Sequence, residues 1–99
     1  MAQFDVHRLN SGEALVLDCQ SDLLDQLNTR FVVPLIPRGQ APAAADRLNP
    51  VFTIAGQEVL MATQFAAAVL SQELSEPVIS LRERSFEIVG ALDVLISGV

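Results

Sequence analysis

Short apolar segments bounded by turn residues dominate the first three quarters of the chain, and they predict strands. Residues 3–9 partly alternate apolar and polar positions, as in a strand with one buried face. Residues 31–36 are continuously apolar, which is typical of a strand buried on both faces, and Pro34 within them predicts a bulge or an unpaired edge position. Gly56 supplies the positive φ that a hairpin turn requires. The predicted strands are Gln3–Leu9, Glu13–Cys19, Phe31–Ile36, Val51–Ile54, Glu58–Thr63 and Val69–Leu74.

The last twenty residues, Ser80–Val99, have apolar positions at helical spacing and predict one helix that runs to the end of the chain. Ser80 is expected to be the N-cap, and Glu83, three residues later, completes a capping box. Glu76-Pro77 is expected to close the β region before this helix. The apolar positions require burial on more than one side. They form a stripe of Leu81, Ile88, Leu92 and Leu95, surrounded by Phe86, Val89, Val94 and Ile96.

The connections between the predicted strands differ in character. Pro37–Pro50 contains three prolines, one glycine and four alanines, and reads as a long loop with one helical turn at Ala43–Leu48. This loop is either a partner-binding arm or only a connection. A second helical turn is expected at Gln64–Ala68. In the connection after Cys19, the side chains expected to point inward are those of Leu23, Leu24 and Leu27.

Taken together, the elements predict a mainly β (α+β) fold, a small barrel of five or six strands with one C-terminal helix, in a single domain over residues 1–99. Hydrophobic residues make up 51% of the 99 residues, and charged residues make up 18%. A domain of this size buries only about two thirds of its unfolded surface. So much apolar material predicts a second covered surface, and hence a homodimer.

The formal net charge of −6, with six arginines and no lysine, disfavours direct nonspecific binding of nucleic acids. An acidic body favours a basic or polar protein surface as its partner. The N-terminus has no signal-peptide pattern, and no apolar run is long enough to span a membrane. With one cysteine there is neither an intrachain disulfide nor a thiolate metal cage. We therefore expect a cytoplasmic protein.

Few residues are candidates for catalysis or metal binding. His7 is the only histidine, and although Asp5 lies two residues back on the same face, we expect an exposed strand histidine rather than a proton-transfer group. Cys19 is expected to be a buried small hydrophobe. Asp18, Asp22 and Asp25 could bind a divalent ion, but they lack an EF-hand pattern and are expected to be solvated turn carboxylates. The prediction is a protein without cofactor or metal that is not an enzyme.

The segment Val16–Leu35 resembles the CcdB toxins of bacterial toxin–antitoxin systems, and the likeness covers nearly the full chain. The residues that carry it are Asp18, Gln20-Ser21-Asp22, Asp25, Arg30, Val33-Pro34-Leu35, Asn49-Pro50-Val51, Met61-Ala62-Thr63 and Gly98-Val99.

This resemblance implies an SH3-like β-barrel with a C-terminal helix, in a tight homodimer related to the Kid/MazF toxins. It also implies an activity, which is binding of the DNA gyrase A subunit and trapping of gyrase on cleaved DNA. A CcdA-type antitoxin with a disordered tail would neutralise the toxin, and the complex would repress their shared operon. Contact with DNA is then only indirect, through the antitoxin complex.

The resemblance places the gyrase-binding residues at the end of the chain, at Ile96, Ser97, Gly98 and Val99. Where the family motif reads Trp-Gly-Ile, this chain reads Ser97-Gly98-Val99. Serine lacks the stacking and the ~1.5–3 kcal/mol of apolar burial that a Trp would supply. Either Ile96 and Val99 carry the contact instead, or the protein is a weakened relative. In the other interpretation the tail only ends the helix, with Gly98 at its C-cap.

Two alternative functions remain at this point. A Kid/MazF-like endoribonuclease would need basic groups around a cleft, and the scattered arginines argue against it. A non-toxic paralogue would keep only the antitoxin-binding surface. The sequence does not assign that surface; its candidates are the acidic turn Asp18–Asp25 and the loop Pro37–Pro50.

Overall fold

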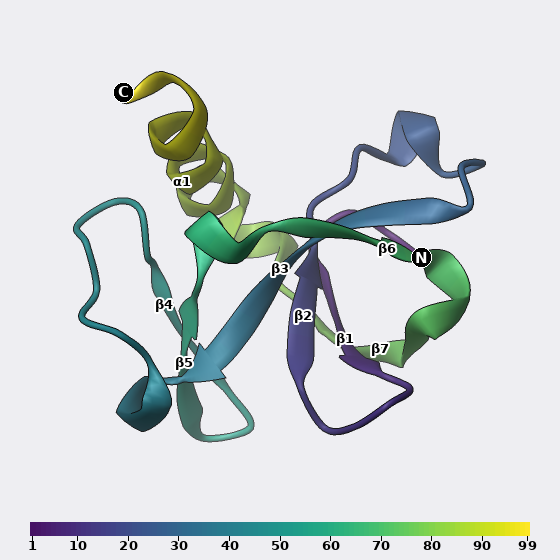
Figure 1. Cartoon of the computed structure of the whole chain (residues 1–99), viewed down its shortest axis with the longest axis horizontal. Helices are drawn as coiled ribbons and strands as arrows, with labels where there is room; N and C mark the ends of the chain where they lie inside the picture. Colours follow the sequence, from purple (N-terminus) through teal and green to yellow (C-terminus); the bar gives the residue numbers. More distant parts are fainter.

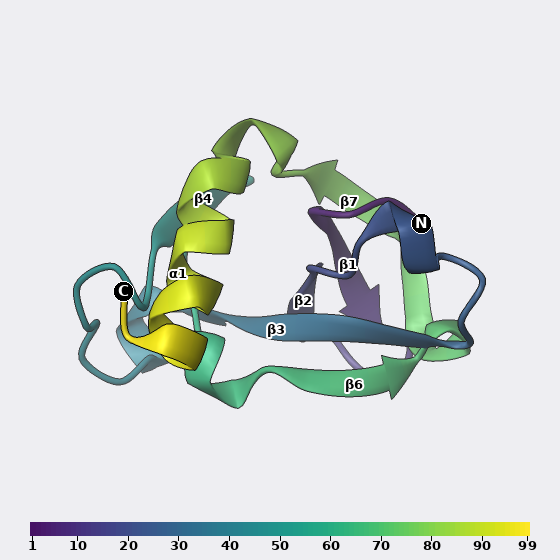
Figure 2. The same cartoon turned by 90° about the horizontal axis from the view of Figure 1, so that it is seen from above.

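A computed structural model describes residues 1–99 and folds them into one strongly bent antiparallel sheet with a helix at its C-terminal end (Figure 1). The hydrogen-bonded strand order is β4-β5-β3-β2-β1-β7, and β6 pairs with β3 beside β5. Seen from above, β6 and β3 lie along one side and β1 and β7 along another, so that the sheet curves into a half-open barrel (Figure 2). The predicted mainly β fold with a C-terminal helix is confirmed. Its elements are β1 (Asp5–Leu9), β2 (Leu15–Asp18), β3 (Thr29–Pro37), β4 (Val51–Ile54), β5 (Gln57–Met61), β6 (Ala67–Leu70), β7 (Leu74–Ser80) and α1 (Ser85–Ser97).

Strand β3 is the centre of the sheet. It pairs with β2 through residues 32–35, with β6 through residues 29–32, and with β5 through residues 35–37. Pro34 lies where the second edge of β3 passes from β6 to β5, so its missing N–H removes no ladder bond there. The predicted bulge is wrong, because pairing with β2 stays in register through Pro34. The position does lack a strand partner on one side, as a proline in a sheet requires.

The β4–β5 hairpin confirms its prediction. Two residues connect the strands, Ala55 at φ 52° and Gly56 at φ 80°. Positive φ at both central positions is the arrangement of the two-residue hairpin turn whose twist matches that of the strands.

The region before the helix differs from the prediction. Instead of one strand at Val69–Leu74, the chain makes β6, a 3₁₀ turn at Ser71–Glu73 and then β7. The β region also continues through Pro77, which pairs with His7 between two register shifts. β7 is an edge strand, and an edge strand tolerates proline because one row of its N–H groups has no partner in the sheet.

The predicted start of the helix is therefore wrong. Ser80 is the last residue of β7, a 3₁₀ turn covers Arg82–Arg84, and α1 begins at Ser85. The hydroxyl oxygen of Ser80 accepts a hydrogen bond from the backbone N–H of Arg82 at 3.2 Å. This bond lies just before the 3₁₀ turn, whose N-cap is Leu81, and neither Leu81 nor Arg84, the N-cap of α1, makes a side-chain cap bond. With thirteen residues, α1 falls short of the length and apolarity needed to cross a membrane.

Apolar side chains gather in two cores. In the main core, the sheet packs against Ile88 and Ala91 of α1, both fully buried. A smaller core contains Val16, Val32 and Leu74. The main core comprises Phe4, Val6, Leu17, Cys19, Val33, Leu35, Phe52, Ile54, Val59, Met61, Leu81, Ile88 and Ala91.

The smaller core also contains charged and polar groups. His7 lies opposite Val16 in register, and Asp18 and Arg30 stand two residues from Val16 and Val32, on the same face of their strands. All three polar side chains are at most 1% exposed. The expectation that His7 is exposed is wrong, because β6 and β7 close this side of the sheet (Figure 2). His7 Nδ1 lies 2.7 Å from the carbonyl oxygen of Ser75 in β7.

Candidate functional site

The end of α1 combines a regular helix stop with an exposed tip. Gly98 adopts φ 78° and its N–H donates to the carbonyl oxygen of Val94 at 2.9 Å, which is a left-handed C-cap. The Ser97 hydroxyl donates to the carbonyl oxygen of Asp93 at 2.8 Å. The polar groups at this terminus therefore bond back onto their own helix, and the interpretation of Gly98 as the helix cap is confirmed.

The apolar side chains at the same terminus face solvent. Ile96 is 80% exposed and Val99 is 73% exposed. The structure thus brings the four residues expected from the sequence to one tip, where two branched apolar side chains flank a serine and a glycine. The Ser97 hydroxyl is bonded within the helix, whereas most of the surface of the Ile96 and Val99 side chains is in contact with solvent. Such a tip is suited to insertion into an apolar pocket of another protein.

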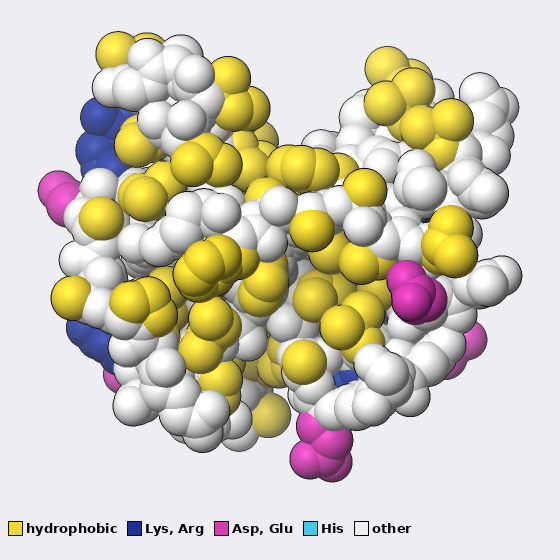
Figure 3. Space-filling model, viewed as in Figure 1, with side chains coloured by type: hydrophobic (Ala, Val, Ile, Leu, Met, Phe, Trp, Pro, Cys, Tyr) yellow, Lys and Arg dark blue, Asp and Glu magenta, His cyan; other side chains and the backbone are white.

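A second apolar projection stands opposite the helix end. The β2–β3 loop carries Leu23, Leu24 and Leu27, which were expected to point inward, but Leu23 is 87% exposed and the other two are about half exposed. In the space-filling view, the end of α1 and this loop rise on either side of a shallow hollow rich in apolar atoms (Figure 3). Strand β6 crosses between them (Figure 1). The pattern of apolar and polar positions could not predict this exposure. The three leucines lie outside the strands and the α-helix, so no periodicity indicates which way their side chains point.

The loop is held by a buried polar network that starts at the end of β2. Asp18 accepts hydrogen bonds from Arg30 Nε at 2.9 Å and from the backbone N–H of Gln20 at 3.0 Å. Gln20 in turn accepts from the backbone N–H of Phe31 and donates to the carbonyl oxygen of Leu24. Asp18 and Arg30 thus form a buried ion pair that fixes both ends of the leucine-bearing loop.

Asp22 anchors the same loop from outside. Its carboxylate accepts from the backbone N–H of Gln3 at 2.8 Å and from Arg82 at 3.4 Å. The hydrogen bond from Gln3, helped by Arg82, lowers the pKa of Asp22 below its usual value. Because Asp18 is engaged with Arg30 while Asp22 is engaged at the N-terminus, the carboxylates of the acidic turn do not converge. No group of three metal-ligating side chains forms anywhere in the structure.

The residues considered for catalysis are placed apart. Cys19 is 7% exposed, and burial, with a smaller effect of Asp18, raises the pKa of its thiol to about 12. This confirms the predicted buried small hydrophobe. Four of the six arginines pair with a carboxylate, and the remaining two, Arg8 and Arg47, line different hollows. The two unpaired guanidinium groups therefore do not share one hollow.

Comparison with models of protein families finds that residues 3–98 match the family described as CcdB protein. No curated protein matches the chain.

Proposed function

The chain belongs to the CcdB family, the gyrase-poisoning toxins of toxin–antitoxin modules, and we propose that it binds the A subunit of DNA gyrase and traps gyrase on cleaved DNA. Members of this family are not themselves enzymes. Trapping the cleaved complex blocks replication and transcription, so the protein acts by occupancy of its target. The observation that carries the proposal is the exposed apolar tip of α1.

Ile96 and Val99 supply the contact energy in this proposal. Full burial of a branched apolar side chain contributes about 1.5–3 kcal/mol, and both side chains are largely exposed in the isolated chain. Ser97 contributes little, because its hydroxyl is already satisfied by the carbonyl oxygen of Asp93. Gly98 turns the backbone out of the helix, which separates Val99 from the helical stripe.

The proposed active form is a homodimer. The hollow between α1 and the β2–β3 loop offers apolar surface for a twin subunit. Strands β3 and β6 and the turn before β6 also carry exposed apolar side chains, those of Phe31, Leu70 and Phe65. A dimer with a two-fold axis presents two helix tips to a gyrase that is itself two-fold symmetric. The second tip then binds intramolecularly, which strengthens the whole contact.

A CcdA-type antitoxin would neutralise this toxin and, in complex with it, repress their operon. Since gyrase works on DNA in the cytoplasm, the proposal places the toxin there. An acidic toxin without lysine contributes little to operator binding itself, so the antitoxin would supply the DNA contact.

The test is expression without antitoxin, scored as growth inhibition, together with a gyrase cleavage-complex assay on purified protein. Deleting Gly98-Val99 should abolish both effects while leaving the dimer dissociation constant unchanged. Ser97→Trp should strengthen gyrase binding, because it adds aromatic surface at the tip. Full toxicity of the truncated protein would contradict the proposal. Cleavage of RNA with gyrase untouched would favour the ribonuclease alternative, and normal growth under full-length expression would favour the non-toxic paralogue.

A further inference from the structure

A groove of about 700 Å³ lies between the β1–β2 hairpin on one side and β3, β5 and the 3₁₀ turn after β3 on the other. Its volume is within the ~300–1,000 Å³ of sites that bind specific small molecules. The turns of both hairpins lie at the end of the molecule away from the tip of α1 (Figure 1). No residue of α1 or of the β2–β3 loop lines the groove, so it is separate from the contact proposed for gyrase.

The groove is the open end of the main core. Side chains two residues apart on a strand point to the same face of the sheet. In β1 the core-facing row passes from the fully buried Val6 to the exposed Arg8, and in β5 it passes from the buried Val59 to the exposed Gln57. Leu15 pairs with Arg8 across the hairpin and packs against the main core. The rows of the half-open barrel therefore end in an apolar floor with a polar rim.

The walls of the groove are formed before any ligand binds. Leu15 of β2 pairs with Leu35 of β3, and Pro37 at the end of β3 pairs with Val59 of β5. Proline also fixes its own φ, which limits movement of the backbone where β3 ends. A ligand would therefore not have to order these strands on binding.

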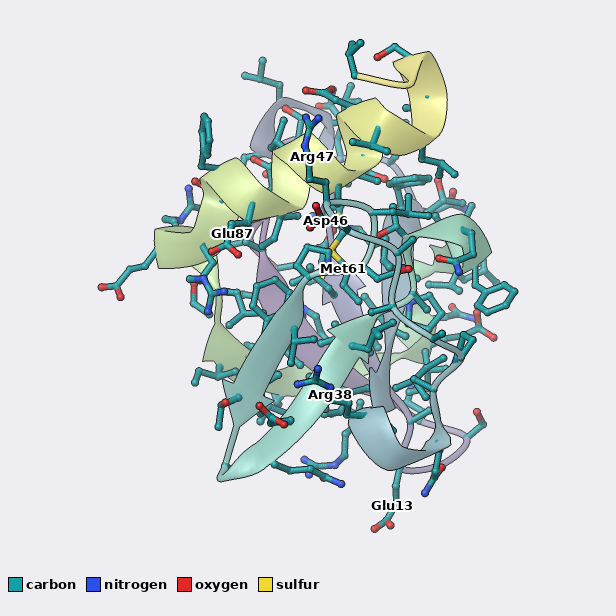
Figure 4. The ribbon with its side chains drawn as sticks, turned by 90° about the vertical axis from the view of Figure 1, so that its left-hand side faces the viewer. Glu13, Arg38, Asp46, Arg47, Met61 and Glu87 are labelled. Atoms are coloured by element: carbon teal, nitrogen blue, oxygen red, sulfur yellow. The ribbon has the colours of Figure 1, made fainter.

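Arg8 is the only cation that lines the groove, and none of the ion pairs of the protein includes it. Glu13 is the only carboxylate of the lining, and Figure 4 shows its side chain at the lower end of the molecule, extending away from the body. Gln40 and Gln57 add side-chain amides, which can donate hydrogen bonds. The groove thus combines an unpaired guanidinium and neutral donors with an apolar floor.

From this we infer that the groove between the β1–β2 hairpin and β5 binds a small organic anion with an apolar body, such as an aryl or alkyl carboxylate. Arg8 would bind the carboxylate, since the planar guanidinium matches its two oxygens. The apolar body would lie over Leu15 and Pro37, where it leaves water. This inference is independent of the proposed action on gyrase.

The test compares 4-phenylbutyrate with the neutral 4-phenylbutyramide and the cationic 4-phenylbutylamine, which have similar shapes, and with acetate, an anion without an apolar body. Binding to the full-length protein is followed by backbone amide shifts during titration at low ionic strength. 4-Phenylbutyrate should bind with a dissociation constant of about 1 mM or below, as expected for a ligand of this size. It should bind roughly tenfold more tightly than each of the other probes. Its shifts should fall on residues 8–16, 34–40 and 57–59.

A matched pair of arginine variants checks the site. Arg8→Gln should weaken binding of 4-phenylbutyrate roughly tenfold, because it removes the cation and keeps a polar side chain at the rim. Arg47→Gln makes the same change of net charge at the other guanidinium without a carboxylate partner, which lines a different hollow, and should leave binding unchanged.

A third variant tests the space rather than the charge. Ala14 is exposed and lines the groove, so Ala14→Phe should place a ring in the groove and remove most of the binding. Equal binding of the carboxylate and the amine, no binding of 4-phenylbutyrate, equal losses in the two arginine variants, unchanged binding to Ala14→Phe, or shifts confined to other surfaces would each overturn the inference.

Discussion

Replacing Asp18 by alanine is expected to destabilise the protein by about 3–5 kcal/mol, because it leaves the Arg30 guanidinium buried without a counter-charge. Asp18 is 0% exposed and Arg30 is 1% exposed, and their closest atoms, Oδ2 and Nη2, are 2.6 Å apart. The backbone N–H of Gln20 loses its acceptor as well. Both losses fall on groups that water cannot reach, so no solvation offsets them.

The size of this effect is large for a small domain. Total stabilities are typically about 5–15 kcal/mol, so the loss removes a substantial part of the whole. For a domain near 100 residues, 1 kcal/mol shifts the melting temperature by about 4–8 °C, so a loss of about 3–5 kcal/mol gives an expected drop of roughly 12–40 °C. Asp25→Ala in the same loop, where the carboxylate is exposed and unpaired, should change the free energy of unfolding by about 0.5 kcal/mol or less.

Urea unfolding of each variant measures these differences in the free energy of unfolding. All variants are compared at one protein concentration, because association adds to the apparent stability. The double variant Asp18→Leu/Arg30→Met removes both charges and should recover most of the lost stability, since a buried pair is often no better than apolar residues of similar size. The reasoning fails if Asp18→Ala loses less than about 1 kcal/mol. It also fails if the double variant is as unstable as Asp18→Ala.

Two further predictions concern the acidic turn and the helix end. Because the folded-state pKa of Asp22 is lowered by the Gln3 N–H, its contribution to stability is present above the ordinary carboxyl pKa and is lost as the pH falls through the lowered value. Unfolding of the wild type and of Asp22→Asn, followed from about pH 6 to 2, should show that loss only in the wild type; identical profiles would contradict it. Gly98→Ala should cost about 1 kcal/mol in thermal unfolding, because Gly98 has φ 78°, whereas Gly39→Ala, without a positive φ, should be nearly neutral. Equal losses in the two glycine variants would show that backbone conformation at the helix end is not the cause.

Local signals in the sequence were enough for the elements that depend on local chemistry. The hairpin around Gly56 follows from the need for positive φ, and the end of the helix at Gly98 follows from the preference for glycine at a left-handed C-cap. The start of the helix was misplaced, since Ser80 and Glu83 satisfy a capping pattern that the longer strand β7 overrides. Pro77 reads as a strand breaker unless one knows that β7 is an edge strand.

Contacts between distant segments explain what the sequence could not predict. His7 is buried because β7, some seventy residues later, lies beside β1, and no pattern near His7 records that. The exposure of Leu23 depends on the Asp18–Arg30 pair and on Gln20, which hold its loop. From their residue types alone, these three charged or polar side chains would be expected at the surface, but all three are buried. Likewise, Phe86 fits the apolar stripe of α1, and only the position of the Ala44–Pro50 loop shows that it lines an open groove.

The three pairings of β3 have a consequence for how the protein unfolds. Val33 and Leu35 belong to the main core while Val32 belongs to the smaller one, so β3 cannot detach without opening both to water. Local opening is therefore confined to segments outside both cores, and the strands that carry the leucine loop and support α1 are lost only together. A cellular protease that cleaves only the globally unfolded chain would act after both projections, the end of α1 and the β2–β3 loop, have lost their structure. The toxin's lifetime in its fully presented form is then set by one cooperative event.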